Sequence, residues 1–177
     1  YKDQVRHLTH AVVKAIDPFA RTLRTEFDEI GFDDAIIIPP QGAADIVRQA
    51  GLLETDAAGR PGAWAAFDPL HLHAVGDERV FLVGDLLGRA SPLFGAFPKS
   101  AHMAVRQGRI AADGIIARTR GVPPAPTLPD SQCHVHTDVD PPEMMRIEAA
   151  YRRRGDGLIV QSLRQVEERQ PRGEDEA

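Results

Sequence analysis

The chain has 177 residues, enough to bury a hydrophobic core in one domain or in two small ones. Its net charge of −5 and sequence pI of about 5.8 exclude an electrostatic basis for binding nucleic acid or an anionic membrane surface. No apolar run reaches the roughly 18 residues that a membrane span needs, and the single cysteine, Cys133, excludes an internal disulfide. The chain starts at Tyr1 without an initiator Met, inside a pattern typical of folded sequence, which predicts a fragment or a processed product.

The first part of the chain predicts three extended segments, at residues 4–14, 22–27 and 32–38. The last of them ends in three consecutive isoleucines and stops at Pro39-Pro40. A short all-apolar run between turn signals is typical of a strand buried on both faces. Proline lacks an amide donor and has a fixed φ, so this strand is expected to end there.

A short helix and a loop are predicted next. Residues 43–50 predict a helix with Ile46 and Val47 facing inward and Gly51 as its carboxyl cap. Residues 54–62 are dense in Gly, Asp and Ala and predict a polar loop.

A strand followed by a helix start forms the most informative part of the pattern. Val80 to Val83 predict a strand that ends at Gly84-Asp85, and a loop rich in Gly and Pro leads to Lys99 and Ser100. Ligands of open α/β sheets bind at the carboxyl ends of strands, and a helix amino terminus offers free amides and a partial positive charge. These features predict a cofactor cradle, although Gly-Asp alone is also a common turn dipeptide.

The clearest helix is predicted from Ala101 to about Arg120, with Ser100 as its amino-terminal cap and Gly121 at its end. One apolar stripe at helical spacing is expected to pack inward; its members are Met103, Gln107, Ile110, Ala111, Gly114 and Ile115.

The remainder predicts a linker and a β-hairpin. Residues 122–129 contain four prolines and predict an extended linker at a domain boundary. Residues 143–151 and 158–166 flank a Gly-containing turn and predict a hairpin. The acidic end, residues 174–177, predicts a solvated tail.

Several of these segments, in this order, resemble the flavoprotein subunit of flavocytochrome c sulfide dehydrogenases, in the pyridine nucleotide-disulfide oxidoreductase superfamily. Val80 to Asp85 resembles the flavin-contacting Gly-Asp motif of that superfamily. The narrower resemblance rests on Ile-Ile-Ile-Pro-Pro-Gln at 36–41, Phe-Pro-Lys-Ser at 97–100, Gln-Gly-Arg-Ile-Ala-Ala at 107–112 and Ser-Gln-Cys at 131–133. It covers about residues 32–151.

The resemblance implies a set of FAD contacts. Asp85 would accept a hydrogen bond from a ribityl hydroxyl, and Gly84 would leave room for the flavin chain. Pro98, Lys99 and Ser100 would lie beside the pyrimidine edge of the isoalloxazine ring, where a cation and a helix amino terminus stabilise the reduced, negatively charged flavin.

The resemblance also implies the ring environment and the redox centre. Pro40 and Gln41 would line the ring region. Cys133 would be one half of a disulfide beside the flavin that receives the sulfur of sulfide by thiol–disulfide exchange.

The implied fold class is α/β, with the returning half of an FAD-binding Rossmann-type domain and a small β-rich carboxyl-terminal interface domain. Residues 1–38 would end an inserted nucleotide-binding-type domain, 39–125 would form the returning half, and 126–177 would begin the interface domain. The parent enzyme would oxidise small-molecule sulfide to sulfane sulfur or polysulfide and pass electrons to a c-type cytochrome subunit in the periplasm.

Two parts of such an enzyme are not found in these 177 residues. The chain contains no G-x-G-x-x-G phosphate loop and no second cysteine. We therefore expect that this chain alone neither binds FAD tightly nor turns over.

Three alternatives remain open. One is a sulfide:quinone oxidoreductase-like or other disulfide-type flavoprotein. Another is a non-enzymatic metal-binding module built from Cys133-His134-Val135-His136, with Asp138 and Asp140 close behind and a second cluster at His71 and His73. Zinc sites draw ligands from separated pairs, and on a strand Cys133 points away from His134 and His136, so no metal ligands are assigned. The third is an interaction module in which an exposed sheet edge pairs with another copy of the chain.

Overall fold

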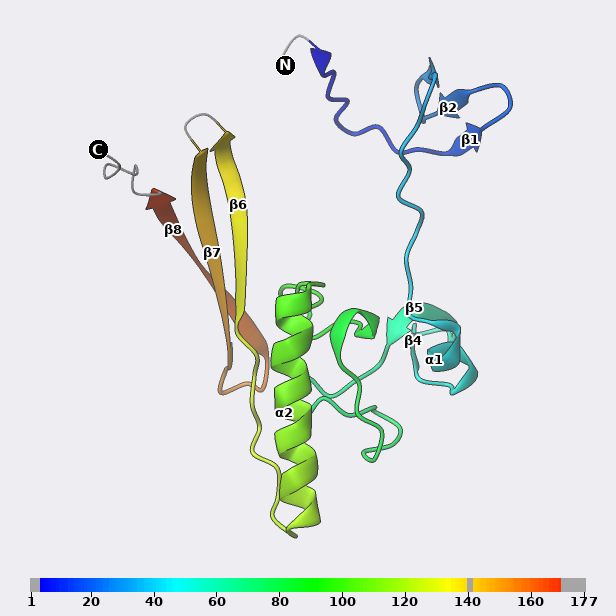
Figure 1. Cartoon of the computed structure of the whole chain (residues 1–177). Helices are drawn as coiled ribbons and strands as arrows, with labels where there is room; N and C mark the ends of the chain where they lie inside the picture. Colours follow the sequence, from blue (N-terminus) through cyan, green and yellow to red (C-terminus); the bar gives the residue numbers. More distant parts are fainter. Residues whose placement is uncertain (1–3, 140–141, 170–177) are drawn as a thin grey trace, which may run out of the picture. The chain divides into compact units, whose positions relative to one another are not determined.

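The computed structural model describes residues 4–139 and 142–169. The chain divides into two compact units, Tyr1–Pro40 and Gln41–Ala177 (Figure 1). This division falls two residues after the boundary that the sequence predicts at residue 38.

The first unit contains a small antiparallel sheet in the order β1-β2-β3, formed by Ala15–Asp17, Thr22–Arg24 and Glu29–Gly31. The turn between the first two strands forms around Asp17, whose Oδ1 accepts hydrogen bonds from the amides of Phe19 and Ala20, both at 2.8 Å. Short polar side chains of this kind stabilise turns by bonding to the backbone that follows them.

Two of the extended segments predicted in this region are not strands. Residues 5–14 have no regular structure apart from a turn, and residues 32–40 are a connection whose Ile36 and Ile38 are 101% and 81% exposed. The prediction of a doubly buried strand at 32–38 was therefore wrong. A β-strand is stable only with a hydrogen-bonded neighbour, and no strand in the described part of the chain pairs with these residues.

The second unit begins with a short helix and a hairpin. Helix α1 spans Asp45–Gln49, with Val47 buried and Ile46 68% exposed, so only one of the two predicted inward residues faces the core. Gly51 ends the helix at φ 69°, as predicted. Residues 54–62, predicted as a loop, form part of a hairpin of β4 (Leu53–Thr55) and β5 (Pro61–Ala65).

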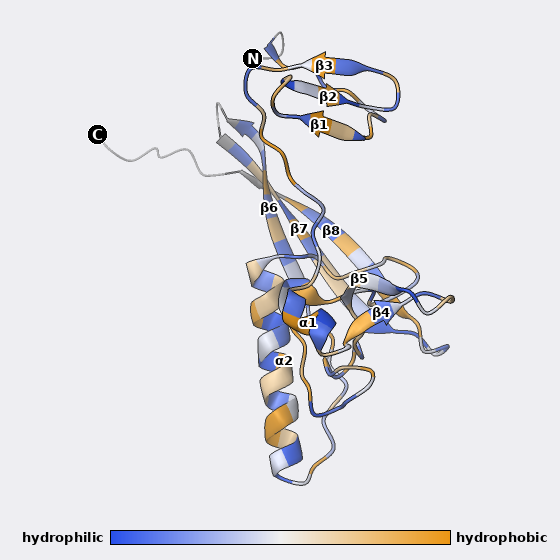
Figure 2. Cartoon of the chain, turned by 90° about the vertical axis from the view of Figure 1, so that its right-hand side faces the viewer, coloured by the Kyte–Doolittle hydropathy of each residue, from blue (hydrophilic) through white to orange (hydrophobic). Residues whose placement is uncertain are grey.

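Helix α2 spans Ala101–Thr119 and confirms the predicted helix. Ser100 caps it, because its Oγ accepts a hydrogen bond from the amide of Met103 at 3.3 Å, and Gly121 follows its end at φ 68°. Of the predicted stripe, Met103, Gln107 and Ala111 are buried. Figure 2 shows hydrophobic and hydrophilic residues alternating along this helix.

The carboxyl-terminal part is an antiparallel sheet in the order β6-β7-β8, formed by Ser131–Val139, Pro142–Arg153 and Ile159–Arg169. Strands β7 and β8 confirm the predicted hairpin, and Gly157 makes its turn at φ 87°. Strand β6 was not predicted as an element. The predicted acidic tail lies outside the described residues.

Aromatic side chains join the sheet to the rest of the second unit. Phe97 lies edge-on to Tyr151 of β7, with ring centroids 4.9 Å apart, and also contacts Phe67 and Phe94. A buried hydrogen bond of 2.7 Å from Ser91 Oγ to the carbonyl of Ile159 adds a polar link. These contacts hold the strands beside α2, as Figure 1 shows.

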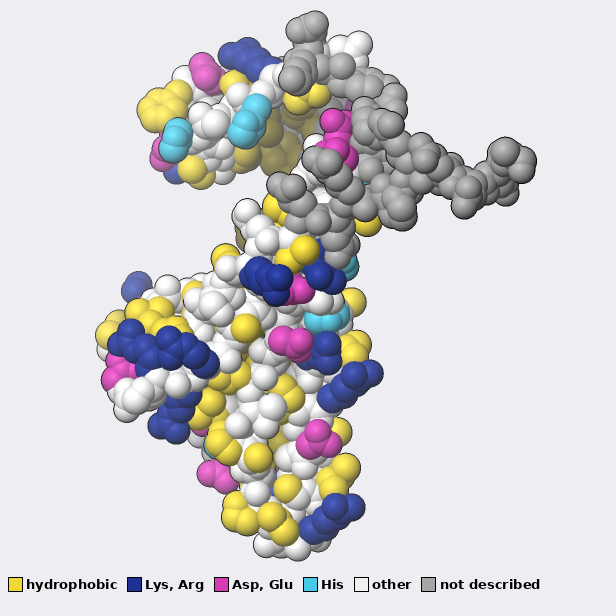
Figure 3. Space-filling view, turned by 90° about the vertical axis from the view of Figure 1, so that its left-hand side faces the viewer, with side chains coloured by type: hydrophobic (Ala, Val, Ile, Leu, Met, Phe, Trp, Pro, Cys, Tyr) yellow, Lys and Arg dark blue, Asp and Glu magenta, His cyan; other side chains and the backbone are white. Residues whose placement is uncertain are grey.

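The fold is mixed α and β, with three small antiparallel sheets among the described strands and a β-rich carboxyl-terminal part. This confirms the fold class at the coarse level, whereas a Rossmann-type half stays a prediction. No helix in residues 4–139 and 142–169 is long and apolar enough to cross a membrane. On the face shown in Figure 3, acidic and basic side chains are scattered among hydrophobic ones.

Candidate functional site

The predicted Gly-Asp motif lies at the start of a short 3-10 helix, η2 (Gly84–Leu86). The preceding run, Val80 to Val83, is not a regular strand, so that prediction was wrong; Phe81 makes only an isolated antiparallel bridge with His73. Gly84 has φ 79°, a left-handed conformation that glycine adopts without strain. The chain therefore turns sharply where the strand was expected to continue to Gly84.

Gly84 is held against α2 by a buried side chain. Its amide donates a hydrogen bond of 2.7 Å to Oε1 of Gln107, which is only 1% exposed. A Cβ at Gly84 would lie 3.5 Å from the Cβ of Ala104, an ordinary contact, so the positive φ rather than the space favours glycine here. Gln107 thus fixes the position of η2 relative to the helix.

Lys99 connects the same segment to the β4–β5 hairpin. Its Nζ donates hydrogen bonds to the carbonyls of Asp85 and Leu87, the latter at 2.8 Å. The ammonium also lies 3.6 Å from the ring centroid of Trp64, a cation–π distance. Partial burial lowers the pKa of Lys99, and the nearby carboxylates of Asp85 and Glu54 oppose that shift.

The amino terminus of α2 also contacts the start of β6. The amide of Gln132 donates a hydrogen bond to Nδ1 of His102 at 3.4 Å, and Arg106 forms an ion pair with Asp130 at 3.1 Å. Cys133 is the next residue on the strand, exposed and opposite Ile147 in the register of β6 and β7. The predicted redox cysteine therefore comes one residue after Gln132, which contacts the first turn of α2.

The predicted flavin contacts fall in two parts of the chain. Gly84 and Asp85 lie against the first two turns of α2, because Gly84 bonds to Gln107 and the Asp85 carbonyl accepts from Lys99; Ser100 caps the helix, and Pro98 precedes Lys99 and is exposed. The remaining two are exposed residues of the connection at which the units divide: Pro40 is the last residue of the first unit and Gln41 the first of the second.

A hollow of about 700 Å³ lies beside the β4–β5 hairpin. Glu54, Arg60 and Arg89 are among its lining residues, and neither Asp85 nor Lys99 belongs to them. The predicted flavin contacts thus do not line this hollow.

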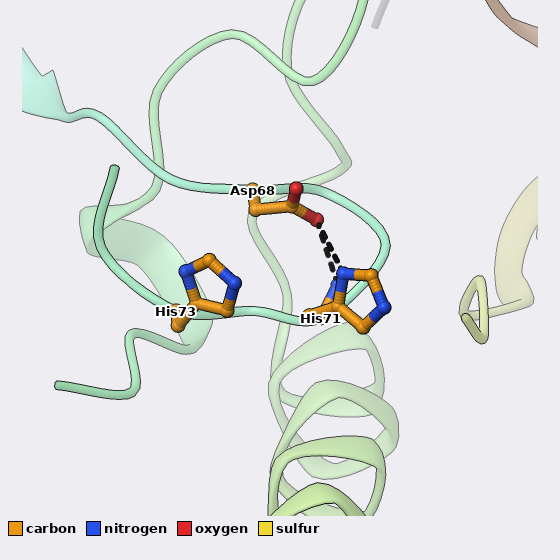
Figure 4. A group of neighbouring side chains, drawn as sticks. All are labelled: Asp68, His71 and His73. Atoms are coloured by element: carbon orange, nitrogen blue, oxygen red, sulfur yellow. Dashed lines mark hydrogen bonds and ion pairs between the residues drawn. The ribbon is translucent and has the colours of Figure 1, made fainter. Parts of the chain in front are cut away.

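One cluster of side chains that could bind a metal ion extends the sequence prediction. His71 and His73 were singled out by sequence, but Asp68, which completes the group, was not (Figure 4). The signal present in the sequence is the spacing Asp-x-x-His-x-His. Among the described residues, Cys133, His134 and His136 do not form such a group, and Asp140 lies outside the described residues.

The chain matches no model of a known protein family.

Proposed function

We propose that this chain is the carboxyl-terminal part of an FAD-dependent sulfide dehydrogenase and supplies part of its flavin-binding surface. The observation that carries the proposal is the packing of Gly84 and Asp85 against the first two turns of α2 through Gln107 and Lys99, next to the cap Ser100, with Cys133 one residue beyond the contact between His102 and Gln132. These residues come from separate stretches of the sequence, and the resemblance to sulfide dehydrogenases implies a role for Gly84, Asp85, Lys99, Ser100 and Cys133 among them.

The donor and acceptor groups in this region fit FAD. The Asp85 carboxylate is exposed, and no hydrogen bond in the described part of the chain uses it, so it can accept one from a ribityl hydroxyl. The α2 amino terminus carries a partial positive charge, and the Lys99 ammonium lies close by. Together they favour the negative charge that a flavin ring gains on reduction.

FAD, when bound, supplies a two-electron acceptor that can release electrons one at a time. The chain's own contribution to the sulfur chemistry is Cys133, joined by a disulfide to a cysteine outside these 177 residues. The sulfur of sulfide attacks one sulfur of that disulfide, so that a new S–S bond forms, the old one breaks and the second cysteine leaves as a thiolate. The disulfide takes up the two electrons of the sulfide sulfur in this exchange, and a bound FAD would supply the acceptor that allows the disulfide to form again, with a c-type cytochrome as the final acceptor.

The cytochrome partner and the periplasmic location belong to this proposal through the resemblance alone. A sulfide:quinone oxidoreductase-like enzyme is the alternative, and the two differ in the final electron acceptor. Reduction of a c-type cytochrome, rather than of a quinone, by the sulfide-reduced protein is the expected result.

The test uses the longer protein that contains this segment, purified with its flavin. Cys133→Ser is expected to abolish sulfide-dependent bleaching of the flavin band while FAD content stays unchanged. Asp85→Asn is expected to lower FAD retention. Asp113→Asn, an exposed position farther along α2, is the matched control and should change neither quantity.

Normal bleaching in Cys133→Ser, or a purified parent protein without flavin, would contradict the proposal. The 177-residue chain by itself is expected to purify without FAD, because it contains no phosphate loop. Full flavin occupancy in this chain would contradict the expectation that FAD binding requires the missing phosphate loop.

A further inference from the structure

Three side chains capable of binding a metal lie together in the loop between β5 and η2. Asp68, His71 and His73 each present one ligand atom, and these atoms all lie within 4.8 Å of one another. Figure 4 shows the carboxylate and the two imidazoles turned toward a common space. All three residues are partly exposed, so an ion could reach them from solvent.

The backbone of this loop is fixed by its own hydrogen bonds. The amide of Asp68 donates to the carbonyl of His73, and the amide of Leu72 donates to the carbonyl of Asp68, both at 2.8 Å. Leu72 is fully buried and has φ 57°. The two histidines on either side of this buried leucine are both partly exposed.

The ligand side chains are positioned as well. Oδ1 of Asp68 accepts hydrogen bonds from the amides of Leu70 and His71, at 2.8 and 2.9 Å. Nδ1 of His73 lies 3.0 Å from the carbonyl of Ala74, so a proton on this nitrogen leaves the lone pair on Nε2. A histidine whose other ring nitrogen donates to a backbone carbonyl is the usual arrangement of a metal ligand.

His71 completes the group with its Nδ1, which lies 3.2 Å from Oδ1 of Asp68. The two imidazole rings are nearly parallel, with an interplanar angle of 14° and centroids 5.8 Å apart. In Figure 4 this nitrogen faces the carboxylate. A metal ion would replace the direct contact between this nitrogen and Asp68 Oδ1.

The spacing suits a small transition-metal ion. Zinc binds imidazole nitrogen and carboxylate oxygen at about 2.0–2.1 Å, and tetrahedral geometry then places neighbouring ligand atoms about 3.3 Å apart. The 3.2 Å between His71 and Asp68 already has this value. The wider separations, of up to 4.8 Å, have to shorten by about 1.5 Å, which rotation of these partly exposed side chains can achieve.

We propose that Asp68, His71 and His73 form a site for a divalent transition-metal ion, with Zn²⁺ as the ion that this ligand set favours. Two imidazoles and one carboxylate are a ligand set of zinc and non-haem iron sites and leave at least one position open for water. The assignment does not depend on FAD or on Cys133, so it stands or falls independently of the proposed function.

The test uses the untagged 177-residue chain, stripped with a chelator and titrated with Zn²⁺ by calorimetry and with Co²⁺ by visible absorption. The expected result is about one equivalent bound, with the visible bands of nitrogen- and oxygen-coordinated Co²⁺. His71→Gln and His73→Gln are each expected to weaken binding by at least about tenfold. Zn²⁺ is also expected to raise the Tm of the unsubstituted chain, because it binds the folded state.

The matched controls are His136→Gln and Cys133→Ser, which remove ligands of the rival cluster on β6. Both should bind Zn²⁺ as the unsubstituted chain does. Equal metal-free Tm values would show that the glutamine variants are folded, and Asp68→Asn provides an independent third removal of a ligand. Absence of stoichiometric binding, binding that survives both glutamine substitutions, or loss of binding in Cys133→Ser would each overturn the proposal.

Discussion

Gly88 lies where the backbone following η2 passes directly beside the β4–β5 hairpin. Its amide donates a hydrogen bond of 2.9 Å to the carbonyl of Ala65. A Cβ at this position would lie 2.8 Å from that carbonyl oxygen and 2.1 Å from Oε1 of Glu54. The Glu54 carboxylate cannot move away without losing its hydrogen bond to the amide of Arg89.

We therefore predict that Gly88→Ala lowers the free energy of unfolding by about 1–3 kcal/mol, the usual range for overpacking. Gly108→Ala is the control, because Gly108 lies within α2 and its Cβ would meet nothing within 4 Å. Helix propensity should make that variant more stable by about 0.5–1 kcal/mol. Chemical denaturation measures both, and equal stability of the two variants would contradict the predicted close approach.

Asp77 illustrates a purely local electrostatic effect. Its carboxylate accepts hydrogen bonds from Nε and the terminal nitrogen of Arg79, at 2.9 and 2.7 Å, and from the Arg79 amide. The side-chain bonds from Arg79 are the main cause that lowers the pKa of Asp77 to about 2. The folded pKa lies below the ordinary value of 3.8, so the interaction stabilises the fold above that value and is lost as pH falls from about 4 to 2.

The expected result of a carboxyl-carbon NMR titration is thus a midpoint of about 2 for Asp77. Arg79→Gln should move the midpoint upward, because it removes both side-chain donors. Failure of the midpoint to move would show that the ion pair does not form in solution.

At the scale of elements, the buried side chain of Gln107 joins α2 to η2, because its Oε1 accepts a hydrogen bond from the backbone amide of Gly84. Gln107 is predicted to be essential for this contact, because its loss leaves the partly buried amide of Gly84 without its acceptor. Gln107→Leu should lower the free energy of unfolding by about 1–3 kcal/mol.

Arg109→Leu provides the matched substitution on the exposed face of the same helix. It should change the free energy of unfolding by less than about 0.5 kcal/mol, since surface changes away from special contacts have small effects. A similar decrease in the free energy of unfolding in both variants would contradict this prediction, because it would show that leucine destabilises the helix without involving the hydrogen bond.

The helices and strands also show which sequence signals were sufficient to predict an element. Helix α2 and the β7–β8 hairpin were predicted correctly, because a serine cap, a terminal glycine and a glycine turn act within a few residues. Val80 to Val83 have the composition of a strand, but their only ladder contact is the bridge between Phe81 and His73. Composition indicates that a segment can pair, and the neighbouring chain decides whether it does.

At the scale of the whole molecule, the chain forms two compact units. The exposed connection that ends at Pro40 is the predicted site of limited proteolysis, because its isoleucines and backbone lie open to solvent. A chain starting at Gln41 is expected to keep the circular dichroism signal of α2 and the Tm of its own unit. A chain starting at residue 57, which lacks β4, should have a lower Tm than the chain starting at Gln41. Equal Tm values for these two shortened chains would contradict the assignment of β4 to the folded second unit.

The sequence by itself determined the local features of this protein: helix α2 with its caps, the β7–β8 hairpin, and the residue types from which a flavin-binding surface is proposed. Only the tertiary structure decided that residues 32–38 remain an unpaired connection, that Lys99 binds backbone carbonyls and the face of Trp64, and that Asp68 joins His71 and His73. The physical reason is the distance along the sequence over which each interaction acts. Caps and turns are satisfied by groups a few residues away, whereas strand pairing and side-chain clusters depend on backbone approach that only packing provides.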